Sequence, residues 1–583
     1  MYSWPTNFES KLLFSNNWRS IFARALFLSA ISLGVATLLE LAAPLLIGAL
    51  VDRVTLSPGS QPADIGAAYA LRWLSQRSVG VLCTAFLGVI TCRMLFDTLQ
   101  AATLQRAGLV MTQRLRERLF FHLEHLPMSF YDANATGRLV SRVVNDVRAV
   151  SDLFTASVSV LVLDTLTIVG TVVLLVFLSP LLSLTVLIPL PIMGLITFGF
   201  GKKMAKAYRR VRLLAAEMTG FLAENIRAHS LIQLFAAEAK QENQFNEILK
   251  QHHEAQLETV HIMSLVQPSA NILNGLALAG LVGLGGRSVL LGHTTLGMLV
   301  AFLGYQKNIF QPLRDIVEKI NLFLSAMVSS ERITQLLHES TEARPLASAM
   351  ATQKHEGSTL SLGMSFKNVS FRYPGRDTLA LAHIDLEIPS GLSIGIVGPT
   401  GSGKSTLGRL LLRFYEPLSG DIFIGPTNIQ ALALPDLRAQ VGYVPQDVLL
   451  FEGSLWDNLT LGRENAAEQG GRDLVIEKLE QLGAWPLFER RGGLDLKLHE
   501  GGHNLSAGER QLISFARVLL ADPPILLLDE ATSSLDRHTE SLLLRAMRTV
   551  IKGRTSLIIA HRTSTIRHCD RVVALRDGHL ASL

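Results

Sequence analysis

The sequence predicts a chain with two folds: a membrane domain built only of helices, followed by an α/β domain. Hydrophobic residues make up 48% of the chain and charged residues only 18%, whereas soluble proteins carry about 25% charged residues. The mean hydropathy is +0.31. Long apolar segments fill the first half, and short strand-like and helix-like segments alternate in the second. At 583 residues, the chain is long enough for two or more domains.

Six segments of the first half are candidates for helices that cross a membrane. The two clearest are Val160–Phe177 and Leu181–Gly201, each close to the roughly 20 residues that span a bilayer. Only Leu178-Ser179-Pro180 lies between them, which predicts a tight turn. The other four candidates are Ile21–Val51, Val79–Leu104, Ser264–Leu291 and Leu296–Leu313. The last of these is the least apolar, because it is interrupted by Gln306, Lys307, Asn308 and Gln311.

Basic residues indicate how these spans are oriented. The connection after the second span and the connection after the fourth are rich in arginine and lysine, whereas the turn after the third has neither. Because basic connections stay in the cytoplasm, both connections and the N-terminus are predicted to be cytoplasmic. Apolar residues recur at helical spacing in Arg114–Leu123 and Leu213–Leu234. We therefore expect spans two to five to continue as long helices whose tips contact the second domain.

Several charged or polar residues fall inside the predicted spans. Arg93 and Asp97 lie four residues apart, which predicts an ion pair on one helix face. For Glu40 and Asp164 two interpretations remain: contact with a water-filled cavity, or hydrogen bonds to a neighbouring helix. The polar run Gln306–Gln311 fits either a span that lines a wet pathway or a span that ends near the membrane surface.

The overall charge and the cysteines exclude some classes of function. The net charge of +5 is small for this length and matches the basic excess of the predicted cytoplasmic connections, so we expect no nucleic-acid partner. Cys83, Cys92 and Cys569 show neither CxxC nor metal-site spacing. We therefore expect them to be small buried side chains without redox or metal chemistry.

A change of composition separates the two domains. Residues Glu339–Ser361 include proline, glycine and many polar residues that break the apolar pattern. After them, Met364–Tyr373 alternates between apolar and polar residues like a strand. We therefore predict a membrane domain over residues 1–335, a linker over 336–363, and an α/β domain over 364–583.

A phosphate-binding loop lies early in the α/β domain. The loop follows the apolar run Ile394–Val397 and precedes a predicted helix, Thr406–Leu412, which is the context that its mechanism needs. Its backbone N–H groups can wrap phosphates at the positive end of the helix. Lys404 can reach the β- and γ-phosphates, and the hydroxyl of Ser405 can bind Mg²⁺. The loop, which alone fits many ATPases and GTPases, consists of Gly398, Pro399, Thr400, Gly401, Ser402, Gly403, Lys404 and Ser405.

A second segment supplies two carboxylates. Ile525–Leu528 is a short apolar run, as expected of a buried parallel strand, and it ends in Asp529 and Glu530. The strand would deliver Asp529 towards Mg²⁺ and Glu530 towards an attacking water. A carboxylate at that place can orient or deprotonate the water.

A third segment is Leu505-Ser506-Ala507-Gly508-Glu509-Arg510-Gln511. Ser506 and Glu509 fit a capping box at the start of a helix. The same residues also fit an anion site, because a serine hydroxyl, the N–H of Gly508 and a helix N-terminus meet there. The segment lies about 100 residues after the phosphate loop and about 20 before Asp529.

The order and spacing of these three segments resemble those of ATP-binding cassette (ABC) ATPases, with Ser506 in the signature of that family. The resemblance implies that Tyr373 stacks on adenine and that Gln446 contacts Mg²⁺ and relays to the membrane domain. It also implies that His561 contacts the γ-phosphate. Glu500-Gly501-Gly502 and Ser533-Ser534-Leu535-Asp536 resemble the loops that contact the membrane helices and the dimer interface.

These matches give a set of expected site residues. ATP binding is assigned to Tyr373, to the phosphate loop with Thr406 of the next helix, and to Ser506 and Gly508. Mg²⁺ binding is assigned to Ser405, Gln446 and Asp529, and catalysis to Glu530, His561 and Gln446.

The first half resembles the exporters of the same family. Phe130-Tyr131-Asp132, followed by Thr136-Gly137-Arg138-Leu139, is similar to the first cytoplasmic loop of half-transporters, whose six spans precede the ATPase domain. There are two departures. Glu509 stands where the signature often has glutamine. The chain ends at Leu583, where relatives usually continue into a short helical tail.

The resemblance implies an ATP hydrolase coupled to transport, with ATP and Mg²⁺, that exports a substrate. In this family ATP binds between the phosphate loop of one domain and the signature of another, so a dimer with a second half-transporter is implied. The broad apolar spans favour an amphipathic or lipidic cargo. The alternatives are one subunit of a heterodimeric peptide or drug exporter, and an ATP-gated channel or regulator. The expected location is a cell membrane, such as a bacterial inner membrane, with the ATPase domain in the cytoplasm.

Overall fold

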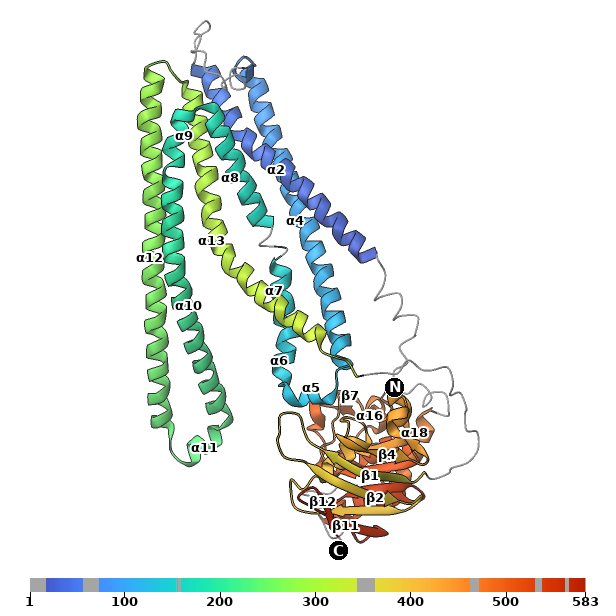
Figure 1. Cartoon of the computed structure of the whole chain (residues 1–583). Helices are drawn as coiled ribbons and strands as arrows, with labels where there is room; N and C mark the ends of the chain where they lie inside the picture. Colours follow the sequence, from blue (N-terminus) through green and yellow to red (C-terminus); the bar gives the residue numbers. More distant parts are fainter. Residues whose placement is uncertain are drawn as a thin grey trace. The chain divides into compact units, whose positions relative to one another are not determined.

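The computed structural model describes residues 17–55, 73–153, 155, 159–342, 362–461, 471–529, 537–560 and 566–581. By their contacts these residues form two compact units. The helical unit contains the residues up to Phe120 together with Val140–His338, and the sheet unit joins Phe121–Leu139 to the residues from Glu339 onwards. The first half is helical and the second is α/β (Figure 1), so the predicted fold class is confirmed.

The described residues of the chain up to His338 form helices joined by short turns, with no strand among them. The first part contains α2 (Asn17–Thr55), α4 (Val79–Glu124), α5 (Met128–Ala133), α6 (Thr136–Ser141), the π-helical η2 (Arg142–Asp146) and α7 (Val147–Asp152). The second part contains α8 (Ser159–Leu178), α9 (Pro180–Leu187), α10 (Pro189–Arg227), α11 (His229–Leu234), α12 (Glu238–Leu290) and α13 (Leu296–His338).

The predicted spans correspond to these helices. Within the described residues, α2, α4, α8, the pair α9–α10, and α12 are long and apolar enough to cross a membrane. Helix α13, the least apolar of the six candidates, is not among them within the described residues. The tight turn after α8 is confirmed: Ser179 caps α9, and its hydroxyl oxygen accepts a hydrogen bond from the N–H of Leu182 at 3.4 Å.

The expected long extensions are present as well. Helices α4, α10 and α12 have 46, 39 and 53 residues, about twice the length that a bilayer requires. The third span differs, because α8 begins at Ser159 and the chain before it is divided into α6, η2 and α7. Asp146 of η2 ties this region to α13, since its carboxylate accepts hydrogen bonds from the Ser329 hydroxyl at 2.8 Å and from Arg332 at 3.5 Å.

Helices α2 and α13 approach each other closely along a line of small residues, here called the α2–α13 seam. A Cβ atom added to Gly48 would lie 2.5 Å from the carbonyl oxygen of Gly297, and one added to Gly304 would lie 3.0 Å from Pro44. The hydroxyl of Tyr305 donates a hydrogen bond to the carbonyl of Leu41 at 2.5 Å. Because lipid tails are as apolar as the helices, such close packing and hydrogen bonds are what hold membrane helices together.

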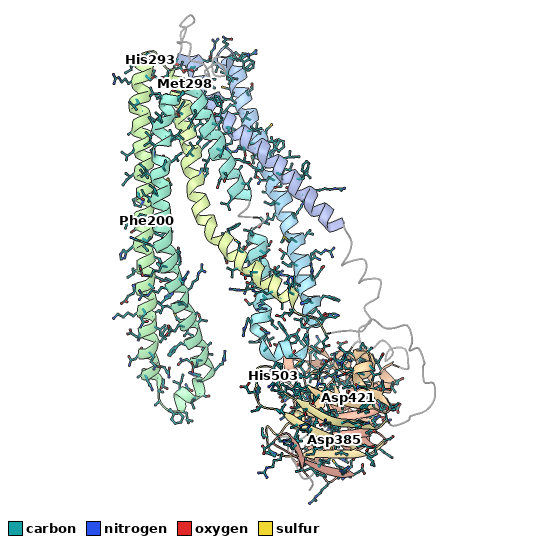
Figure 2. All side chains as sticks on the ribbon, viewed as in Figure 1. Phe200, His293, Met298, Asp385, Asp421 and His503 are labelled. Carbon is teal, nitrogen blue, oxygen red and sulfur yellow. The ribbon has the colours of Figure 1, made fainter. Side chains whose placement is uncertain are left out.

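One carboxylate closes the end of this seam. Asp52 is buried and accepts hydrogen bonds from the Thr295 hydroxyl at 2.7 Å and from the N–H of Gly297 at 2.6 Å. Thr295 in turn accepts the N–H of Met298 at 3.1 Å. Asp52 therefore satisfies one free N–H group at the start of α13 from another helix, and Thr295 satisfies a second. His293 and Met298 lie at this end of the unit (Figure 2).

The polar residues inside the spans make contacts between helices. Arg93 of α4 lies 3.5 Å from Asp97, which confirms the predicted pair, and also 3.2 Å from Glu40 of α2. Gln306, which is buried, donates hydrogen bonds to the carbonyl and side-chain oxygens of Asn274 on α12, at 2.9 and 3.1 Å. Glu40 thus bonds to a neighbouring helix, one of the two expected roles. Neither expectation for the polar run anticipated the contact of Gln306.

The expectation that the cysteines are buried is wrong for Cys83 and Cys92. Both are exposed on α4, and Cys569 is only partly buried. The exposed face of α4 also carries Leu87 and Met94. A helix in a membrane can leave apolar side chains exposed, because its surroundings are lipid, so a pattern of small apolar residues does not predict burial there.

The sheet unit contains two main sheets. A six-stranded sheet has the order β12 (His579–Ala581), β11 (Arg571–Arg576), β3 (Ser393–Val397), β10 (Thr555–Ile559), β9 (Ile525–Asp529) and β6 (Val441–Val444). All its neighbours are parallel except β11 and β12. A four-stranded antiparallel sheet has the order β2 (Leu381–Ile388), β1 (Met364–Phe371), β4 (Ser419–Ile424) and β5 (Thr427–Asn428).

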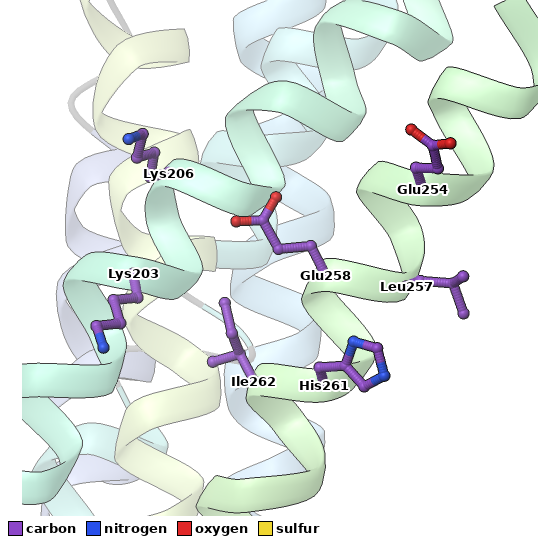
Figure 3. Close-up of a pocket in the computed structure, with 7 residues that line it drawn as sticks. All are labelled: Lys203, Lys206, Glu254, Leu257, Glu258, His261 and Ile262. Atoms are coloured by element: carbon purple, nitrogen blue, oxygen red, sulfur yellow. The ribbon is translucent and has the colours of Figure 1, made fainter.

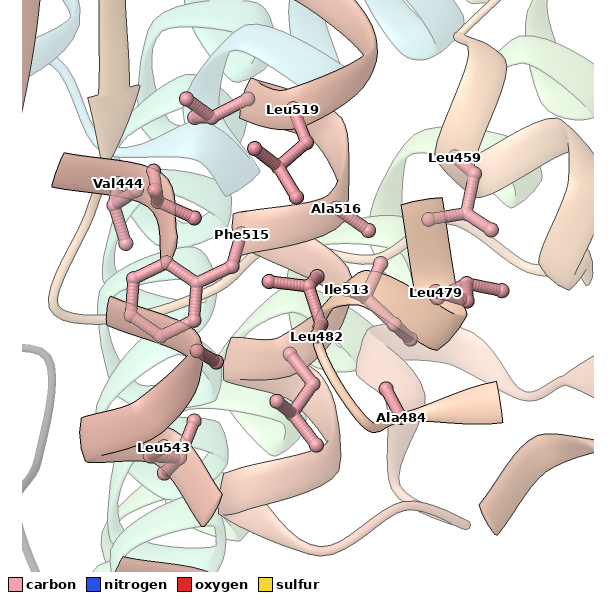
Figure 4. Packing of buried hydrophobic residues seen from close by; sticks show 14 of the residues in the cluster. Val444, Leu459, Leu479, Leu482, Ala484, Ile513, Phe515, Ala516, Leu519 and Leu543 are labelled. Carbon is pink, nitrogen blue, oxygen red and sulfur yellow. The ribbon is translucent and has the colours of Figure 1, made fainter. Parts of the chain in front are cut away.

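Two hydrophobic cores lie on opposite faces of the six-stranded sheet. Ile525 and Leu527 of β9 belong to the core that also contains Leu407 and Leu410 of α14 (Lys404–Leu411). This is called the loop core. The alternate residues of β9, Leu526 and Leu528, belong to the core shown in Figure 4, which contains Ile513 and Phe515 of α20 (Ala507–Ala521). This is called the signature core. The alternation follows from the twofold side-chain period of a strand.

The α2–α13 seam leads to a stability prediction. Gly48→Ala should lower the apparent melting temperature of the purified protein, because the new methyl group meets the backbone of Gly297 and overpacking costs about 1–3 kcal/mol. The matched control is Gly34→Ala on the same helix, where nothing lies within 4 Å of the added Cβ. It should leave stability unchanged or raise it by up to about 1 kcal/mol. Equal melting temperatures for the two variants would contradict the seam.

Candidate functional site

The predicted phosphate loop connects β3 to α14, as the motif requires. Gly403 has φ of +102°, and a Cβ atom there would lie 2.5 Å from the carbonyl oxygen of Ala380. A Cβ on Gly398 would lie 2.1 Å from the carbonyl oxygen of Leu575. Only glycine fits both places, so these two positions fix the path of the loop in front of the helix N-terminus.

Lys404 is folded over the loop that it ends. Its ammonium group donates hydrogen bonds to the carbonyl oxygens of Gly398 and Pro399, both at 2.8 Å, and the residue is only 5% exposed. Within the described residues, the buried hydroxyl of Ser402 has no hydrogen-bond partner. A buried cation and a buried unsatisfied hydroxyl in one loop fit a polyanionic ligand such as the phosphates of a nucleotide.

The expected Mg²⁺ ligands Ser405 and Asp529 lie together. The hydroxyl of Ser405 donates a hydrogen bond to the carboxylate of Asp529 at 3.4 Å. Asp529 ends β9, and Gln446 follows the neighbouring strand β6, whose Val444 pairs with Leu528. Parallel strands end at one edge of their sheet, so these oxygen donors share that edge. Their hydroxyl, carboxylate and amide oxygens are the donors that Mg²⁺ prefers.

Tyr443, also on β6, is a neighbour of this edge. Burial, and then the negative charge of Asp529, raise the pKa of its hydroxyl to about 12. The phenol therefore stays neutral at physiological pH and adds no second anion beside the carboxylate of Asp529.

Tyr373, the expected adenine-stacking residue, lies beside the phosphate-loop helix. Its hydroxyl is 3.1 Å from the Thr406 hydroxyl, with either one as donor. Its ring meets those of Phe371 and Tyr415 edge to face, with centroids 4.9 and 5.2 Å apart. Arg409 of α14 lies over the ring at 5.9 Å. These contacts fix the ring beside the loop, and the tyrosine is only half-buried, which leaves part of it accessible to a flat ligand.

The tip of the connection after the second predicted span contacts this aromatic cluster. Asp132 of α5 accepts a hydrogen bond from the hydroxyl of Tyr415 and another from Arg409 at 3.4 Å. Burial, and then the bond to Asp132, raise the pKa of the Tyr415 hydroxyl, so it stays protonated and remains a donor. The expectation that this tip contacts the second domain is confirmed. The roles of Arg409 and Tyr415 were not predicted, because nothing local in the sequence marks them.

The chain that leaves α13 is tied to the same unit. Arg438 forms two hydrogen bonds to the carboxylate of Glu342, at 3.0 and 3.2 Å. The N–H of Glu342 also donates to the carbonyl of His125 at 2.8 Å. The loop around α5 and the start of the connection after α13 are therefore fastened to each other and to the helix α15 (Leu434–Gln440).

The predicted capping box at the third segment is confirmed. The Ser506 hydroxyl oxygen accepts the N–H of Glu509 at 3.2 Å, and the carboxylate of Glu509 accepts the N–H of Ser506 at 2.7 Å. Gly508 is buried in the first turn of α20. Arg510 donates to the carbonyl of Leu505 at 2.8 Å. The residues of the expected signature thus open a well-capped 15-residue helix.

Several expected site residues cannot be placed. Glu530, His561 and the segment Ser533–Asp536 lie outside the described residues. Glu500–Gly502 is described as a short 3₁₀ turn, η6. A Cβ atom on Gly502 would lie 2.6 Å from the side chain of Leu450, so a glycine is needed for this close approach.

The phosphate loop and the signature helix are built on different cores. Helix α14 packs in the loop core, whereas α20 packs in the signature core on the other face of the sheet. The hydrogen bonds of the Ser506 side chain remain within its own helix. Within the sheet unit, the phosphate loop is therefore supported by the loop core, and the signature motif is supported by the signature core.

The helical unit has a groove of about 510 Å³ between α10 and α12, shown in Figure 3. Its charged residues balance: Lys203 and Lys206 come from α10, and Glu254 and Glu258 from α12. Glu258 also lies 3.8 Å from Arg210. This balance gives the groove no charge excess with which to select an anionic or a cationic ligand.

The chain matches two family models: one described as ABC transporter transmembrane region, over residues 26–313, and one described as ABC transporter, over residues 381–533. It is 30% identical to an ATP-dependent lipid A-core flippase of Chromobacterium violaceum, over 96% of this chain and 91% of the relative. It is 32% identical to a fatty acid ABC transporter ATP-binding/permease protein of Mycobacterium tuberculosis, over 80% of this chain and 72% of the relative.

A solved structure shares the arrangement. It is that of a bacterial Atm1-family ABC exporter with ATP bound, with a TM-score of 0.74 and 26% sequence identity. The match covers 97% of this chain and 95% of that chain. Both predicted parts, the helical half and the α/β half, therefore have counterparts in one exporter.

The geometry of the loop leads to a binding prediction. Lys404→Ala should weaken the binding of a fluorescent ATP analogue by about 10- to 100-fold, as expected for losing a hydrogen bond to a charged group. The control is Lys552→Ala, since Lys552 is an exposed lysine that follows α21 (Arg537–Ile551). It should bind the analogue like the unmodified protein. Unchanged affinity of Lys404→Ala would contradict the assignment of the loop.

Proposed function

The chain belongs to the ABC transporter family, and we propose that it works as a dimeric exporter of an amphipathic or lipidic substrate. It is a multi-pass membrane protein of the exporter type, with an ATP-binding domain that hydrolyses ATP to drive transport. The proposal adds three points: which residues act on ATP, how the subunits assemble, and what is carried.

The dimer rests on one observation: the phosphate loop and the signature helix occur once each and are packed in different cores. Two copies placed head to tail bring the loop of one subunit opposite the signature of the other. Each ATP is then held by Lys404 and the loop glycines on one side and by Ser506 and Gly508 on the other. A homodimer has two such sites with intact residues.

At each site Mg²⁺ would be held by Ser405, Asp529 and Gln446, which supply the oxygen donors described above. When bound there, it would supply positive charge against the charge that develops on the phosphates. Glu530 orients and deprotonates the attacking water, His561 contacts the γ-phosphate, and Tyr373 stacks on adenine. In the sequence Glu530 directly follows Asp529, the last residue of β9.

The contact of Asp132 couples ATP binding and hydrolysis to the membrane helices. Asp132 lies on α5 and bonds to Tyr415 and Arg409, which surround Tyr373. A nucleotide that stacks on Tyr373 therefore acts on residues that hold the cytoplasmic connection. The tip of the second connection, α11, exposes Leu231 and Leu234, and such an apolar surface fits contact with an ATP-binding domain.

The substrate class rests on the apolar spans and on the relatives. One relative is named a lipid A-core flippase and another a fatty acid transporter. A lipidic or amphipathic cargo, carried across a bacterial inner membrane with ATP hydrolysed on the cytoplasmic side, agrees with both. Stimulation of the ATPase by lipid extracts, compared with a panel of drugs and peptides, separates this class from the peptide or drug alternative.

Two alternatives make different predictions. A subunit of a heterodimer would be recovered from its native membrane with a different half-transporter, whereas a homodimer would be recovered with copies of itself. An ATP-gated channel would let the substrate equilibrate without accumulating. The intact series of ATP-site residues favours continuous turnover and so favours a pump.

The assignment of Glu530 is testable in the full-length protein. Glu530→Gln should lower ATP turnover by about 10²- to 10⁴-fold, the usual contribution of a general base, while ATP remains bound. Glu387→Gln, an exposed position on β2, is the control and should hydrolyse ATP at the unmodified rate. Appreciable turnover by Glu530→Gln would reject Glu530 as the base.

Transport itself is tested in vesicles in which the ATP-binding side faces outward. The unmodified protein should accumulate a fluorescent amphipathic lipid against its gradient when ATP and Mg²⁺ are added, and Glu530→Gln should not. Equilibration without accumulation would contradict a pump and favour the channel.

A further inference from the structure

Glu509 places a negative charge at the motif that is proposed to bind a phosphate. One of its carboxylate oxygens accepts the N–H of Ser506 at 2.7 Å, and the other accepts a hydrogen bond from Arg491 at 3.1 Å. The side chain of Glu509 is only 18% exposed. At the third position of a helix a carboxylate stabilises the positive helix end. The same charge opposes any second anion that approaches that end.

Arg491 lies on a different segment, between α19 (Trp485–Glu489) and the 3₁₀ turn η5 (Gly493–Asp495). Its guanidinium makes two contacts at once: one to Glu509 and one to the carbonyl oxygen of Asn504, at 2.7 Å. Asn504 in turn fixes the loop before the signature, since its side chain bonds to the backbone of His499 and of Lys497. Arg491 therefore links the carboxylate of Glu509, on α20, to the loop that precedes α20 at Asn504.

The capping box leaves Ser506 ready to donate. Its hydroxyl oxygen accepts the N–H of Glu509, and a hydroxyl that accepts a hydrogen bond still has its own proton to give. This donor is useful to a phosphate oxygen only when the nearby carboxylate is balanced by a cation. An arginine is suited to this, because it is charged at every physiological pH and its planar fork can bond to two acceptors.

We propose that Arg491 is a positioning residue that compensates the charge of Glu509, so that the helix end at Ser506 keeps its affinity for the γ-phosphate of an ATP held by the facing subunit. The inference rests on the proposed function, which places ATP between the phosphate loop and the signature. The two residues act together. Glu509 caps the start of α20, and Arg491 offsets the repulsion between the carboxylate of Glu509 and a phosphate bound at that helix end.

The experiment is a double-mutant cycle in the full-length protein. The variants are Arg491→Gln, Glu509→Gln and the two together. Arg491→Gln removes the charge and, because its side chain is shorter, also loses the hydrogen bond to the carbonyl of Asn504, so the double variant is needed to separate the two effects. The control is Arg490→Ala, which removes a neighbouring exposed arginine. Each change is also made in the Glu530→Gln background, and the ATP concentration for half-maximal ATP retention is measured at low and high salt.

Arg491→Gln should raise that ATP concentration by about tenfold, the scale of losing a hydrogen bond to a charged group. The loss should shrink as salt screens the unbalanced carboxylate. For the double variant, the ATP concentration for half-maximal retention should fall to within about twofold of the value for Glu509→Gln. Twofold is the usual deviation when one change adds nothing to another. Arg490→Ala should behave like the unmodified protein. A purely structural role of Arg491 predicts neither the rescue nor the salt effect.

The inference is overturned if the double variant remains as weak as Arg491→Gln, because the contact to Asn504 alone then explains the loss. It is also overturned if Arg491→Gln folds, as judged by its melting temperature, and binds ATP normally. If Arg491→Gln does not fold but the double variant does, the inference stands only if the double variant retains ATP at a concentration within about twofold of that for Glu509→Gln, and is overturned otherwise. If neither Arg491→Gln nor the double variant folds, the inference is overturned.

Failure of the proposed function gives a different pattern. If Lys404→Ala and Glu530→Gln leave ATP hydrolysis intact, the ATP-site assignment itself is wrong, whatever the Arg491 variants do. If those two changes abolish hydrolysis and the double variant shows no rescue, only the role of Arg491 is rejected.

Discussion

The architecture of the sheet unit depends on one constraint: strand β9 is buried on both faces. Ile525 and Leu527 pack in the loop core, and Leu526 and Leu528 pack in the signature core, each buried leucine contributing about 2 kcal/mol. β10 shares the constraint, with Leu557 and Ile558 in opposite cores. A polar residue in the interior of β9 would face one core or the other, so the polar group of this strand is found where it ends, at Asp529.

What could be predicted from the sequence was local. The strand–loop–helix at Gly398–Ser405, the capping box of Ser506 and Glu509, the turn at Ser179 and the pair of Arg93 and Asp97 each lie within a few residues, and all are present. Their geometry follows from chain connectivity and helix spacing alone. This is why the fold class and the outline of the ATP site could be predicted before any tertiary contact was known.

What could not be predicted joins residues far apart in the chain. Asp52 bonds to Thr295 and Gly297, and Tyr415 to Asp132, across hundreds of residues. Such pairs depend on which helices or loops become neighbours, and a single sequence does not specify that. Burial failed for a related reason: Cys83 and Cys92 are apolar enough for a core, but in a helix that meets lipid the same composition marks the outer surface.

The α2–α13 seam has a mechanical consequence. Its contacts lie at Gly297, Gly304 and Tyr305, near one end of a helix of 43 residues with a contour length of about 65 Å. The same helix is held again near its other end, where Ser329 and Arg332 bond to Asp146. A shift of the segment that carries Asp146 is therefore passed to the seam, about 36 Å away, through one continuous helix with no loop between them to absorb it.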